Sequence, residues 1–307
     1  MTLNTKESEI EMPNRKVLHY DAFSSVANMG NPAGVVLEAD DLDEKAMQAI
    51  AEKVGFNETV FITGSKKADL RLRYFTPGHE INLCGHATIA SMYCLKTLGW
   101  LQNKDSITIE TNVGNLPISF ANRKGDLFIT MKQDHPRFIP FRGSISALAD
   151  SMGLPEETVD ISKPIVYGST GTWTLLIPIK GLDPFARMCP NNEMFPEVLR
   201  ENPRSSIHPF CIETMDKNAF MHARHFSSPY SGTKEDAITG TASGVMGAYY
   251  LTYLNENSEA ADFFVEQGQE IGRDGRVHVQ VIRNESKMDV YISGTGVFVQ
   301  EFEVQYP

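Results

Sequence analysis

The stretch that decides the fold is Phe75-Thr-Pro-Gly-His-Glu-Ile-Asn-Leu-Cys-Gly-His-Ala-Thr-Ile-Ala-Ser-Met-Tyr-Cys-Leu95. Its Pro77-Gly78 dipeptide predicts a turn, and the small and apolar residues that follow predict a helix beginning at Cys84-Gly85-His86. Because this helix has almost no polar face, we expect other elements to enclose it. The amides of its first turn have no carbonyl partner within the helix, so its N-terminus favours an anion.

The same construction occurs a second time, at Glu235-Asp-Ala-Ile-Thr-Gly-Thr-Ala-Ser-Gly-Val-Met-Gly-Ala-Tyr-Tyr-Leu251. We interpret the two stretches as an internal repeat, which predicts two similar halves whose helix N-termini face each other across a cleft. An alignment of the two stretches pairs Gly85 with Gly240, His86 with Thr241, Cys84 with Thr239, and Glu80 approximately with Asp236.

Composition and charge exclude several classes of partner. The 307 residues carry a formal net charge of -11 and a pI near 5.2, whereas binding to nucleic acid or to an anionic membrane calls for a basic patch. The polar residues 1–16 resemble neither a signal peptide nor an anchor, and we expect them to form a tail. The four scattered cysteines indicate free thiols in a reducing cytoplasm, with neither a disulfide framework nor a zinc site.

The rest of the chain predicts many strands and few helices. We expect strands at 17–23, 35–37, 56–62, 70–75, 106–111, 115–120, 126–131, 166–177, 210–213, 221–226, 277–282, 288–292 and 296–304. We expect further helices between Asp41 or Asp43 and Gly55, and over 145–152, 184–199 and 260–267, with turns at 30–34 and 294–296. Aligning 175–177 with 60–62 sets Trp173 opposite Glu58, so only the first half supplies a carboxylate there.

This order of elements predicts an α+β fold of two pseudo-symmetric domains, each a mostly antiparallel sheet wrapped around a central helix. A change of composition at 133–137 indicates the boundary between them. We therefore expect a tail over 1–16, a first domain over 17–134 plus 293–307, and a second domain over 135–292.

Six motifs together resemble a known family, the phenazine-biosynthesis PhzF-like proteins, in order and spacing over nearly the whole chain from Val17. The motifs are Asp21-Ala-Phe with Gly30-Asn-Pro-Ala-Gly, Asn57-Glu-Thr-Val-Phe, Phe75-Thr-Pro, Leu83-Cys-Gly-His-Ala-Thr, Glu235-Asp-Ala-Ile-Thr-Gly-Thr-Ala, and Gln267-Gly-Gln-Glu-Ile-Gly-Arg273.

The resemblance implies the diaminopimelate-epimerase fold, an active site between the two domains, and a homodimer. It also implies an isomerase that needs no cofactor or metal and moves a proton on a small carboxylate-bearing substrate, with Glu58 as general acid and base. The other residues that we expect in this pocket are His86 and Asp236 in catalytic roles, and Cys84, Gly85, Thr239, Gly240 and Thr241 in substrate binding.

The role of Cys84 leaves alternatives open. Related epimerases and proline racemases use a cysteine at that helix start as one of two bases, but Thr239 stands at the position of the second, which excludes a two-cysteine racemase. A one-base epimerase or a hydroxyproline-type dehydratase would use Cys84 opposite Thr239, because a helix N-terminus favours the thiolate. Without a thiol partner, Cys84 is alternatively an inert, packed cysteine. A binding protein that has lost catalysis is the third hypothesis.

Two further residues have simpler interpretations. Asp236 is able to cap the second motif helix as well as to face the cleft. His222 and His225 lie on a predicted strand at an odd separation, which points them to opposite faces and excludes joint metal binding.

Overall fold

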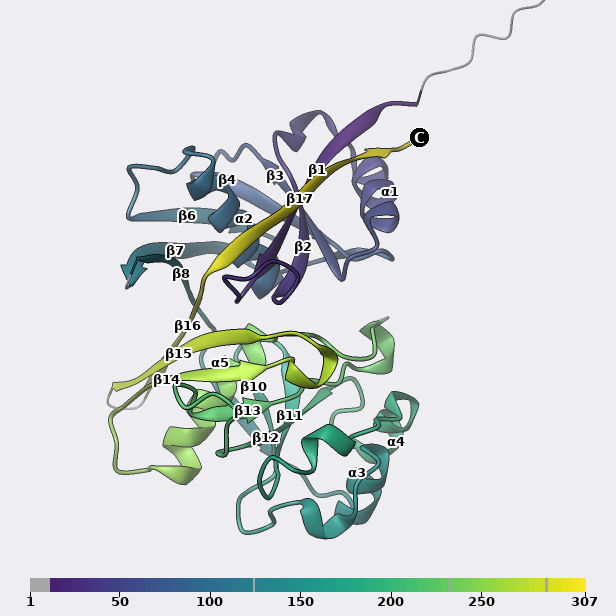
Figure 1. Ribbon diagram of the computed structural model, residues 1–307, viewed down its shortest axis with the longest axis vertical. Helices are drawn as coiled ribbons and strands as arrows, with labels where there is room; N and C mark the ends of the chain where they lie inside the picture. The colour runs from purple at the N-terminus through teal and green to yellow at the C-terminus, as the bar shows by residue number, and fades with distance from the viewer. Residues whose placement is uncertain (1–11, 124, 232, 285–286) are drawn as a thin grey trace, which may run out of the picture.

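The computed structural model describes residues 12–123, 125–231, 233–284 and 287–307, which form two lobes (Figure 1). The strands of the first lobe are β1 (Asn14–Ala22), β2 (Asn31–Val36), β3 (Glu58–Thr63), β4 (Leu70–Phe75), β5 (Glu80–Ile81), β6 (Ser106–Thr111), β7 (Gly114–Arg123), β8 (Asp126–Lys132) and β17 (Gly296–Gln305). Those of the second are β9 (Arg137–Pro140), β10 (Val166–Ser169), β11 (Trp173–Pro178), β12 (Ser206–Cys211), β13 (Met221–Ala223), β14 (Ala260–Gln267), β15 (Gly275–Asn284) and β16 (Lys287–Gly294).

The helices divide between the same two lobes. The first lobe holds α1 (Glu44–Val54) and α2 (Gly85–Thr97), and the second holds α3 (Ile145–Ser151), α4 (Phe195–Val198) and α5 (Gly240–Tyr249), which continues as a π-helical turn over Tyr250–Leu254. In the part of the chain that the structure describes, no helix combines the length and the apolar character needed to cross a membrane.

The strand order repeats from one lobe to the other. The first lobe runs β17-β1-β2-β3-β4-β6-β7-β8, the second runs β9-β10-β11-β12-β13-β14-β15-β16, and β8 pairs with β16. In each lobe the third and fourth strands are parallel, as are the fifth and sixth, and the other pairs are antiparallel. Parallel neighbours need a crossover, and α2 and α5 are the crossovers at equivalent places. The predicted α+β fold, with two sheets that each enclose a central helix, is confirmed.

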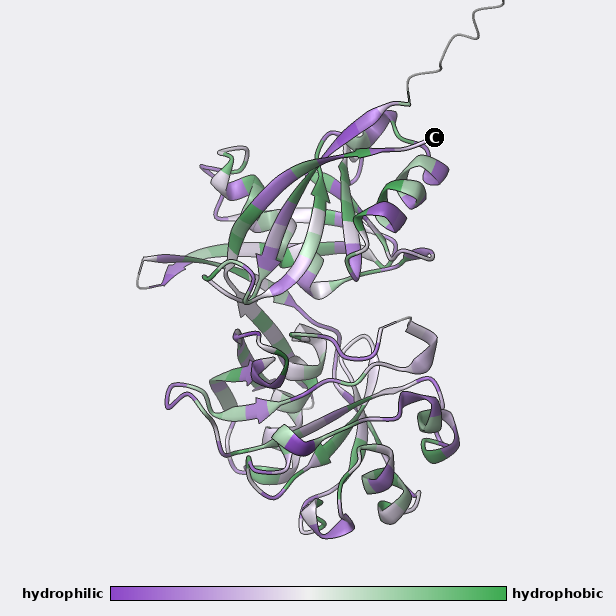
Figure 2. Cartoon of the chain, turned by 45° about the vertical axis from the view of Figure 1, so that its right-hand side comes forward, coloured by the Kyte–Doolittle hydropathy of each residue, from purple (hydrophilic) through white to green (hydrophobic). Residues whose placement is uncertain are grey.

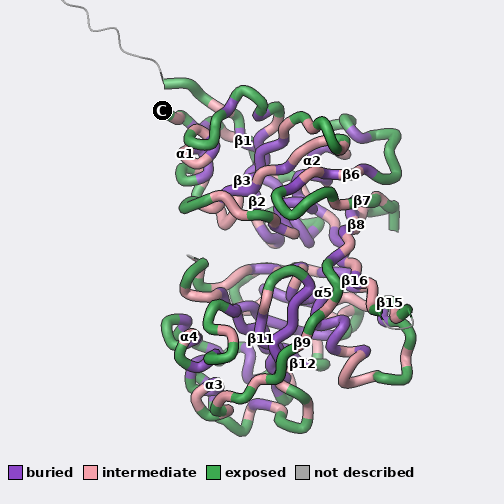
Figure 3. Tube along the Cα trace, turned by 180° about the vertical axis from the view of Figure 1, so that it is seen from behind, coloured by how far each residue is buried: buried purple, intermediate pink, exposed green. Residues whose placement is uncertain are grey.

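The central helices are apolar on all sides. Nine residues of α2 and nine of α5 are buried, whereas α1 carries both hydrophilic and hydrophobic residues beside the C-terminus in Figure 2. The buried segments run through the middle of both lobes, and the exposed ones form the outer loops (Figure 3). The enclosure predicted for the first motif helix therefore holds for both.

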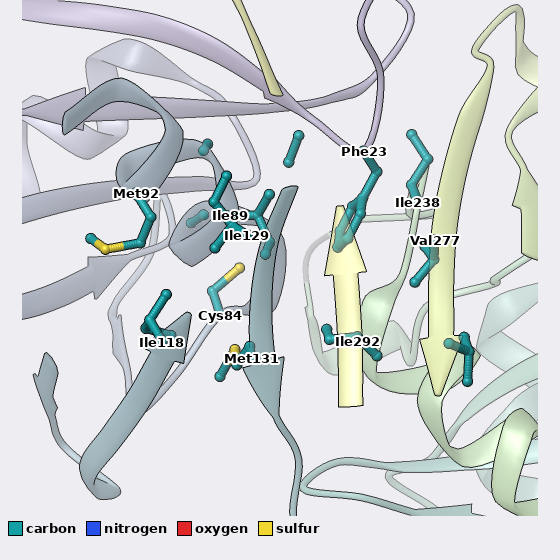
Figure 4. Packing of buried hydrophobic residues seen from close by; sticks show 14 of the residues in the cluster. Phe23, Cys84, Ile89, Met92, Ile118, Ile129, Met131, Ile238, Val277 and Ile292 are labelled. Atoms are coloured by element: carbon teal, nitrogen blue, oxygen red, sulfur yellow. The ribbon is translucent and has the colours of Figure 1, made fainter. Parts of the chain in front are cut away.

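One aromatic residue joins the lobes beside the start of α5. Phe23 is fully buried with its backbone in the left-handed region at φ 64°, and its N–H donates to the carbonyl of Thr295 at 2.8 Å. A Cβ on Gly294 would lie 2.3 Å from the Phe23 ring and one on Gly240 would lie 3.0 Å from it, so neither position has room for a side chain. Figure 4 shows Phe23 beside Ile292.

Three local expectations were wrong. Residues 260–267 form strand β14 instead of a helix, because they pair with β15 along their whole length and Gly268, which resembled a helix end, follows a strand. Residues 184–199 form only 3-10 turns and the short α4. Residues 31–34 lie within β2, where they pair with β1, instead of in a turn.

The segment over 294–296, expected to be a turn between two paired strands, is instead a connection between the lobes. β16 and β17 are not hairpin partners: β17 pairs with β1 of the first lobe, so this segment crosses between the lobes. β1 begins at Asn14, within the predicted tail, because Asn14 pairs with Gln305. Residues 1–11 of that tail lie outside the described residues. We propose that the domains divide near the two crossings, which follow β8 and β16.

The equivalence of Trp173 and Glu58 was wrong as well. Glu58 begins β3, whose counterpart in the second lobe is β12, beginning at Ser206, whereas Trp173 begins β11, the counterpart of β2. Short apolar runs occur in strands at different places in the sheet, so the alignment of 175–177 with 60–62 carried no information about position in the sheet.

A buried ionic network stabilises the second lobe away from the central helix. Nδ1 of His222 contacts Glu266 at 2.8 Å and Nε2 contacts Glu270 at 2.9 Å, and the side chains of His222 and Glu266 are fully buried. Although burial opposes the charged imidazole, hydrogen bonds to the two carboxylates raise the pKa of His222. His222 and His225 do not form a joint metal site, because His222 contacts the two glutamates and His225 contacts His208.

We predict a pH-dependent stability from this network. Because the folded pKa of His222 is raised above its ordinary value of 6.5, the stabilisation is complete below pH 6.5 and is lost as pH rises through the folded value. Urea unfolding across this range should show a free energy of unfolding that falls with rising pH, and His222→Gln should remove that part of the slope. An identical slope in the variant would contradict the prediction.

Candidate active site

All eight residues predicted for the site line one cavity of about 390 Å³, and the cavity is bordered by both lobes. They are Glu58, Cys84, Gly85 and His86 from the first lobe and Asp236, Thr239, Gly240 and Thr241 from the second. Glu80, which the repeat aligned with Asp236, is not part of the lining, because its carboxylate pairs with Arg73 at 2.7 Å.

The first-lobe side of the cavity holds a carboxylate, an imidazole and a thiol in contact. Glu58 is the first residue of β3, and its Oε2 lies 3.0 Å from Nε2 of His86, the second residue of α2. The other ring nitrogen, Nδ1, lies 3.4 Å from Sγ of Cys84, the N-cap of α2. His86 therefore bridges Glu58 and Cys84.

The surroundings act differently on the two groups beside Glu58. Burial, together with the negative charge of Glu58, raises the pKa of the Cys84 thiol. For His86, burial opposes the charged form, but Cys84 and Glu58 outweigh it and raise the pKa well above its ordinary value. The carboxylate of Glu58 thus favours the charged imidazole and disfavours the thiolate. The amide of Ala87 at the helix N-terminus lowers the thiol pKa, as expected, but desolvation is the larger influence.

The same three groups are the donor types that a metal such as Zn²⁺ accepts. Among the described residues, a carboxylate oxygen of Glu58, Sγ of Cys84 and a ring nitrogen of His86 all lie within 4.8 Å of one another. The cluster has the composition of a metal site as well as of an acid and base pair, so a functional assay has to include a chelator.

The second-lobe side is held by hydrogen bonds across the lobes. Nδ2 of Asn31, from β2, donates to Asp236 at 2.8 Å and to the carbonyl of Ile238 at 2.8 Å. The other carboxylate oxygen of Asp236 accepts from the hydroxyl of Thr239 at 2.7 Å. Asp236 thus contacts the side chain of the N-cap residue and not the helix amides, so the capping interpretation was wrong.

Gln267, at the end of β14, fixes the start of α5. Its Nε2 donates to the carbonyl of Asp236 at 2.8 Å, and its Oε1 accepts from the amide of Thr239 at 3.1 Å. The sequence reasoning assigned no role to Asn31 or Gln267, although both stand in quoted motifs. The available signal was their place in those motifs, and the structure buries both side chains, at 0 % exposure for Asn31 and 1 % for Gln267.

The outer part of the cavity was also missed. Several hydroxyl groups line it together with Trp173, and Arg204 is the only arginine or lysine among the lining residues that the structure describes. The Arg204 guanidinium lies over the ring of Tyr230, 5.4 Å from its centroid. These residues come from loops and strand starts of the second lobe, which no local pattern brings together.

The accessibility of the thiols gives a prediction. Cys84 is 8 % exposed and its thiol pKa is raised, whereas Cys189 is exposed. Since the thiolate is the reactive form, iodoacetamide should label Cys189 in the native protein much faster than Cys84, as measured by peptide mass spectrometry. Labelling of Cys84 at the rate of Cys189 would mean that the thiol is ionised and open to the cavity.

Comparison with known proteins decides the family. A family model described as phenazine biosynthesis-like protein, PhzC-PhzF, matches residues 20–302. The chain belongs to the PhzF family. A PhzF relative from Bacillus subtilis named an uncharacterized isomerase, YfhB, is 50 % identical over 287 residues, covering 94 % of this chain and 97 % of its own. Several further relatives are also named isomerases, and the chain is therefore an enzyme.

Solved structures agree with the PhzF assignment. A Bacillus anthracis protein described as a phenazine biosynthesis protein of the PhzF family is 55 % identical and superposes with a TM-score of 0.94 over 96 % of this chain and 100 % of that one. A hydroxyproline epimerase from Agrobacterium vitis, 10 % identical, superposes with a TM-score of 0.59 over 95 % and 92 % of the two chains. At that identity the likeness concerns the fold alone, and it is the epimerase-like fold that the sequence predicted.

Proposed function

We propose that this PhzF-family isomerase moves a carbon-bound proton of a small carboxylate-bearing substrate in the cavity between the lobes, without a cofactor, and that Glu58 is the base and the acid. The observation that carries the proposal is the pair of Glu58 and His86, 3.0 Å apart, in the same cavity as the start of α5.

The chemistry needs a base close to carbon and donors for the charge that develops on the adjacent carbonyl or carboxylate. Nε2 of His86 lies 3.0 Å from Oε2 of Glu58 and so fixes the position of this carboxylate at the cavity. The free amides at the starts of α2 and α5 supply hydrogen bonds to an anionic oxygen. Glycines at both starts, Gly85 and Gly240, face Ile292, and the missing side chain of Gly240 lets α5 begin against Phe23 between the lobes.

Asp236 has a positioning role in this proposal. Both of its carboxylate oxygens already accept hydrogen bonds, one from Asn31 and one from Thr239, which leaves it poorly placed to exchange protons with a substrate. It instead holds the first residues of α5, including Gly240 and Thr241, against the first lobe.

The size of the cavity limits the substrate. Its volume of about 390 Å³ lies toward the lower end of the usual range for small-molecule sites, about 300–1,000 Å³. We therefore propose a substrate somewhat larger than a simple amino acid, with its carboxylate near the helix starts and its remaining part toward Trp173.

The test is proton NMR in deuterium oxide, with and without EDTA. Diaminopimelate, proline, hydroxyproline, dihydro-hydroxyanthranilate and larger carboxylic acids are scanned for loss of a carbon-bound proton signal. Exchange that persists in EDTA supports the proposal, exchange that EDTA abolishes contradicts cofactor independence, and no exchange with any acid favours a protein that binds without catalysis.

A second candidate is favoured by one specific observation, the 3.4 Å contact between Sγ of Cys84 and Nδ1 of His86. In that mechanism His86 takes the thiol proton and Cys84 acts as the single base of an epimerase or dehydratase, opposite Thr239. It predicts that Cys84→Ser abolishes exchange while Glu58→Gln only weakens it, the reverse of the first candidate.

We also propose, on the family resemblance, that the enzyme is a cytoplasmic homodimer. Sedimentation equilibrium of the purified chain measures the assembly directly, and a mass of 34.2 kDa, that of a single chain, would contradict the dimer.

A further inference from the structure

A second histidine borders the cavity on the side of the second lobe. His225, which follows β13, is 8 % exposed and lines the cavity, and its carbonyl accepts from the amide of Asp236 at 3.0 Å. The ring therefore lies next to the segment that leads into α5. Its Nδ1 lies 3.2 Å from Nδ1 of His208 on β12. With Nδ1 occupied by His208, Nε2 is the ring nitrogen left to meet a group bound in the cavity.

Both rings of this pair are neutral at physiological pH. Burial lowers the pKa of His225 to about 4, with the nearby Asp236 working weakly against the shift. Burial and the neighbouring His225 lower the pKa of His208 well below its ordinary value. Each neutral ring carries one N–H, and the contact between the two Nδ1 atoms needs one donor and one acceptor.

The surroundings of His208 decide which ring donates. His208 is fully buried, and within the described ranges its Nε2 has no hydrogen-bond partner. If that nitrogen carried the proton, a buried N–H would be left without an acceptor, which is rarer than a bare acceptor. His208 therefore carries its proton on Nδ1 and donates to His225, which places the proton of His225 on Nε2, facing the cavity.

We propose that His225 is a neutral hydrogen-bond donor that binds an oxygen atom of the substrate, and that His208 is the positioning residue that fixes its tautomer. The ligand group is a carbonyl or carboxylate oxygen, because an ammonium group offers no acceptor to an N–H. The inference rests on the proposed function and deepens it: His225 joins the amides of α5 in stabilising the developing oxyanion, while Glu58 remains the only proton carrier.

The tautomers are measured without any substrate. Long-range proton–nitrogen NMR of the uniformly labelled full chain reports which ring nitrogen of each histidine carries the proton, and His225→Leu and His208→Leu assign the two signals by their loss. We expect a proton on Nε2 of His225 and on Nδ1 of His208. The opposite arrangement, or a charged ring, would overturn the inference whatever becomes of Glu58.

Activity tests the donor itself, with the acid found by the exchange scan. His225→Leu should lower the exchange rate by about 10²-fold, the usual cost of one oxyanion donor, whereas His225→Gln, which keeps an N–H at a similar reach, should recover most of it. His208→Leu should give an intermediate rate together with a mixture of His225 tautomers, which a merely structural role would not produce. His135→Gln, at an exposed position, is the matched control.

If no acid exchanges, acetate is the probe. A saturable change of the His225 Nε2–H signal on titration with acetate, and not with chloride at equal ionic strength, supports an oxygen-binding donor even though the proposed isomerisation has failed. An unchanged signal, or full activity of His225→Leu where exchange is measurable, overturns the inference.

Discussion

Glu58→Gln should lower the rate of carbon-bound proton exchange by roughly 10²–10⁴-fold, the contribution of a positioned general base. Glutamine has nearly the same shape as glutamate but cannot accept the proton, so the variant removes the chemistry and leaves the packing of β3. Loss of the charge beside His86, 3.0 Å away, also lowers the pKa of the imidazole, since Glu58 is one of the groups that raise it.

The control for this variant is Glu52→Gln, the same substitution at an exposed position of α1. Both variants should unfold at the temperature of the wild type to within a few degrees, which separates a catalytic loss from a folding loss. If Glu58→Gln exchanges protons as fast as Glu52→Gln, Glu58 is not the base, and a loss confined to Cys84→Ser would assign that role to the thiol.

Glu266→Leu should cost roughly 3–5 kcal/mol of unfolding free energy, the range observed when one partner of a buried ion pair is removed. The carboxylate of Glu266 is fully buried and accepts from the amides of Met215 at 2.6 Å and Asp216 at 2.9 Å, besides contacting His222 at 2.8 Å. Leucine leaves the two amides and the buried His222 ring without that partner. Urea unfolding monitored by circular dichroism measures the loss.

Two further variants separate the ionic contribution from the loss of a large side chain. Glu52→Leu, at an exposed site, should change the free energy of unfolding by less than about 0.5 kcal/mol. The double variant Glu266→Leu with His222→Leu should lose less stability than the sum of the two single losses, because neither residue of the pair then remains without the other. Strict additivity would mean that Glu266 and His222 do not stabilise each other.

Much of the local structure could be predicted because its causes lie within a few residues. α1 begins after Asp43, whose side chain accepts from the amide of Ala46 at 2.8 Å, and ends at Gly55 with φ 70°. The strand predicted at 70–75 has the observed bounds, since alternation of apolar and polar residues is a local property. Internal repetition likewise identified the starts of α2 and α5, and with them the fold.

Local signals failed where a segment's neighbours decided its state. The residue types at 260–267 suit either a helix or a strand. They form β14 because β15 pairs with all eight of these residues on one side. The same limit explains the misplaced equivalence of Trp173 and Glu58, because the position of a strand in the sheet order depends on pairing between distant segments.

The amino-acid sequence by itself determined the two glycine-led helix starts, the carboxylate at the mouth of β3 and eight of the residues that line the cavity, because each belongs to a short motif. Only the tertiary structure decided that His86 bridges Glu58 and Cys84, that Asn31 and Gln267 hold the start of α5, and that His208 meets His225 beside the cavity. The physical reason is that hydrogen bonds and desolvation depend on distances between atoms, and those distances are set by strands far apart in the chain.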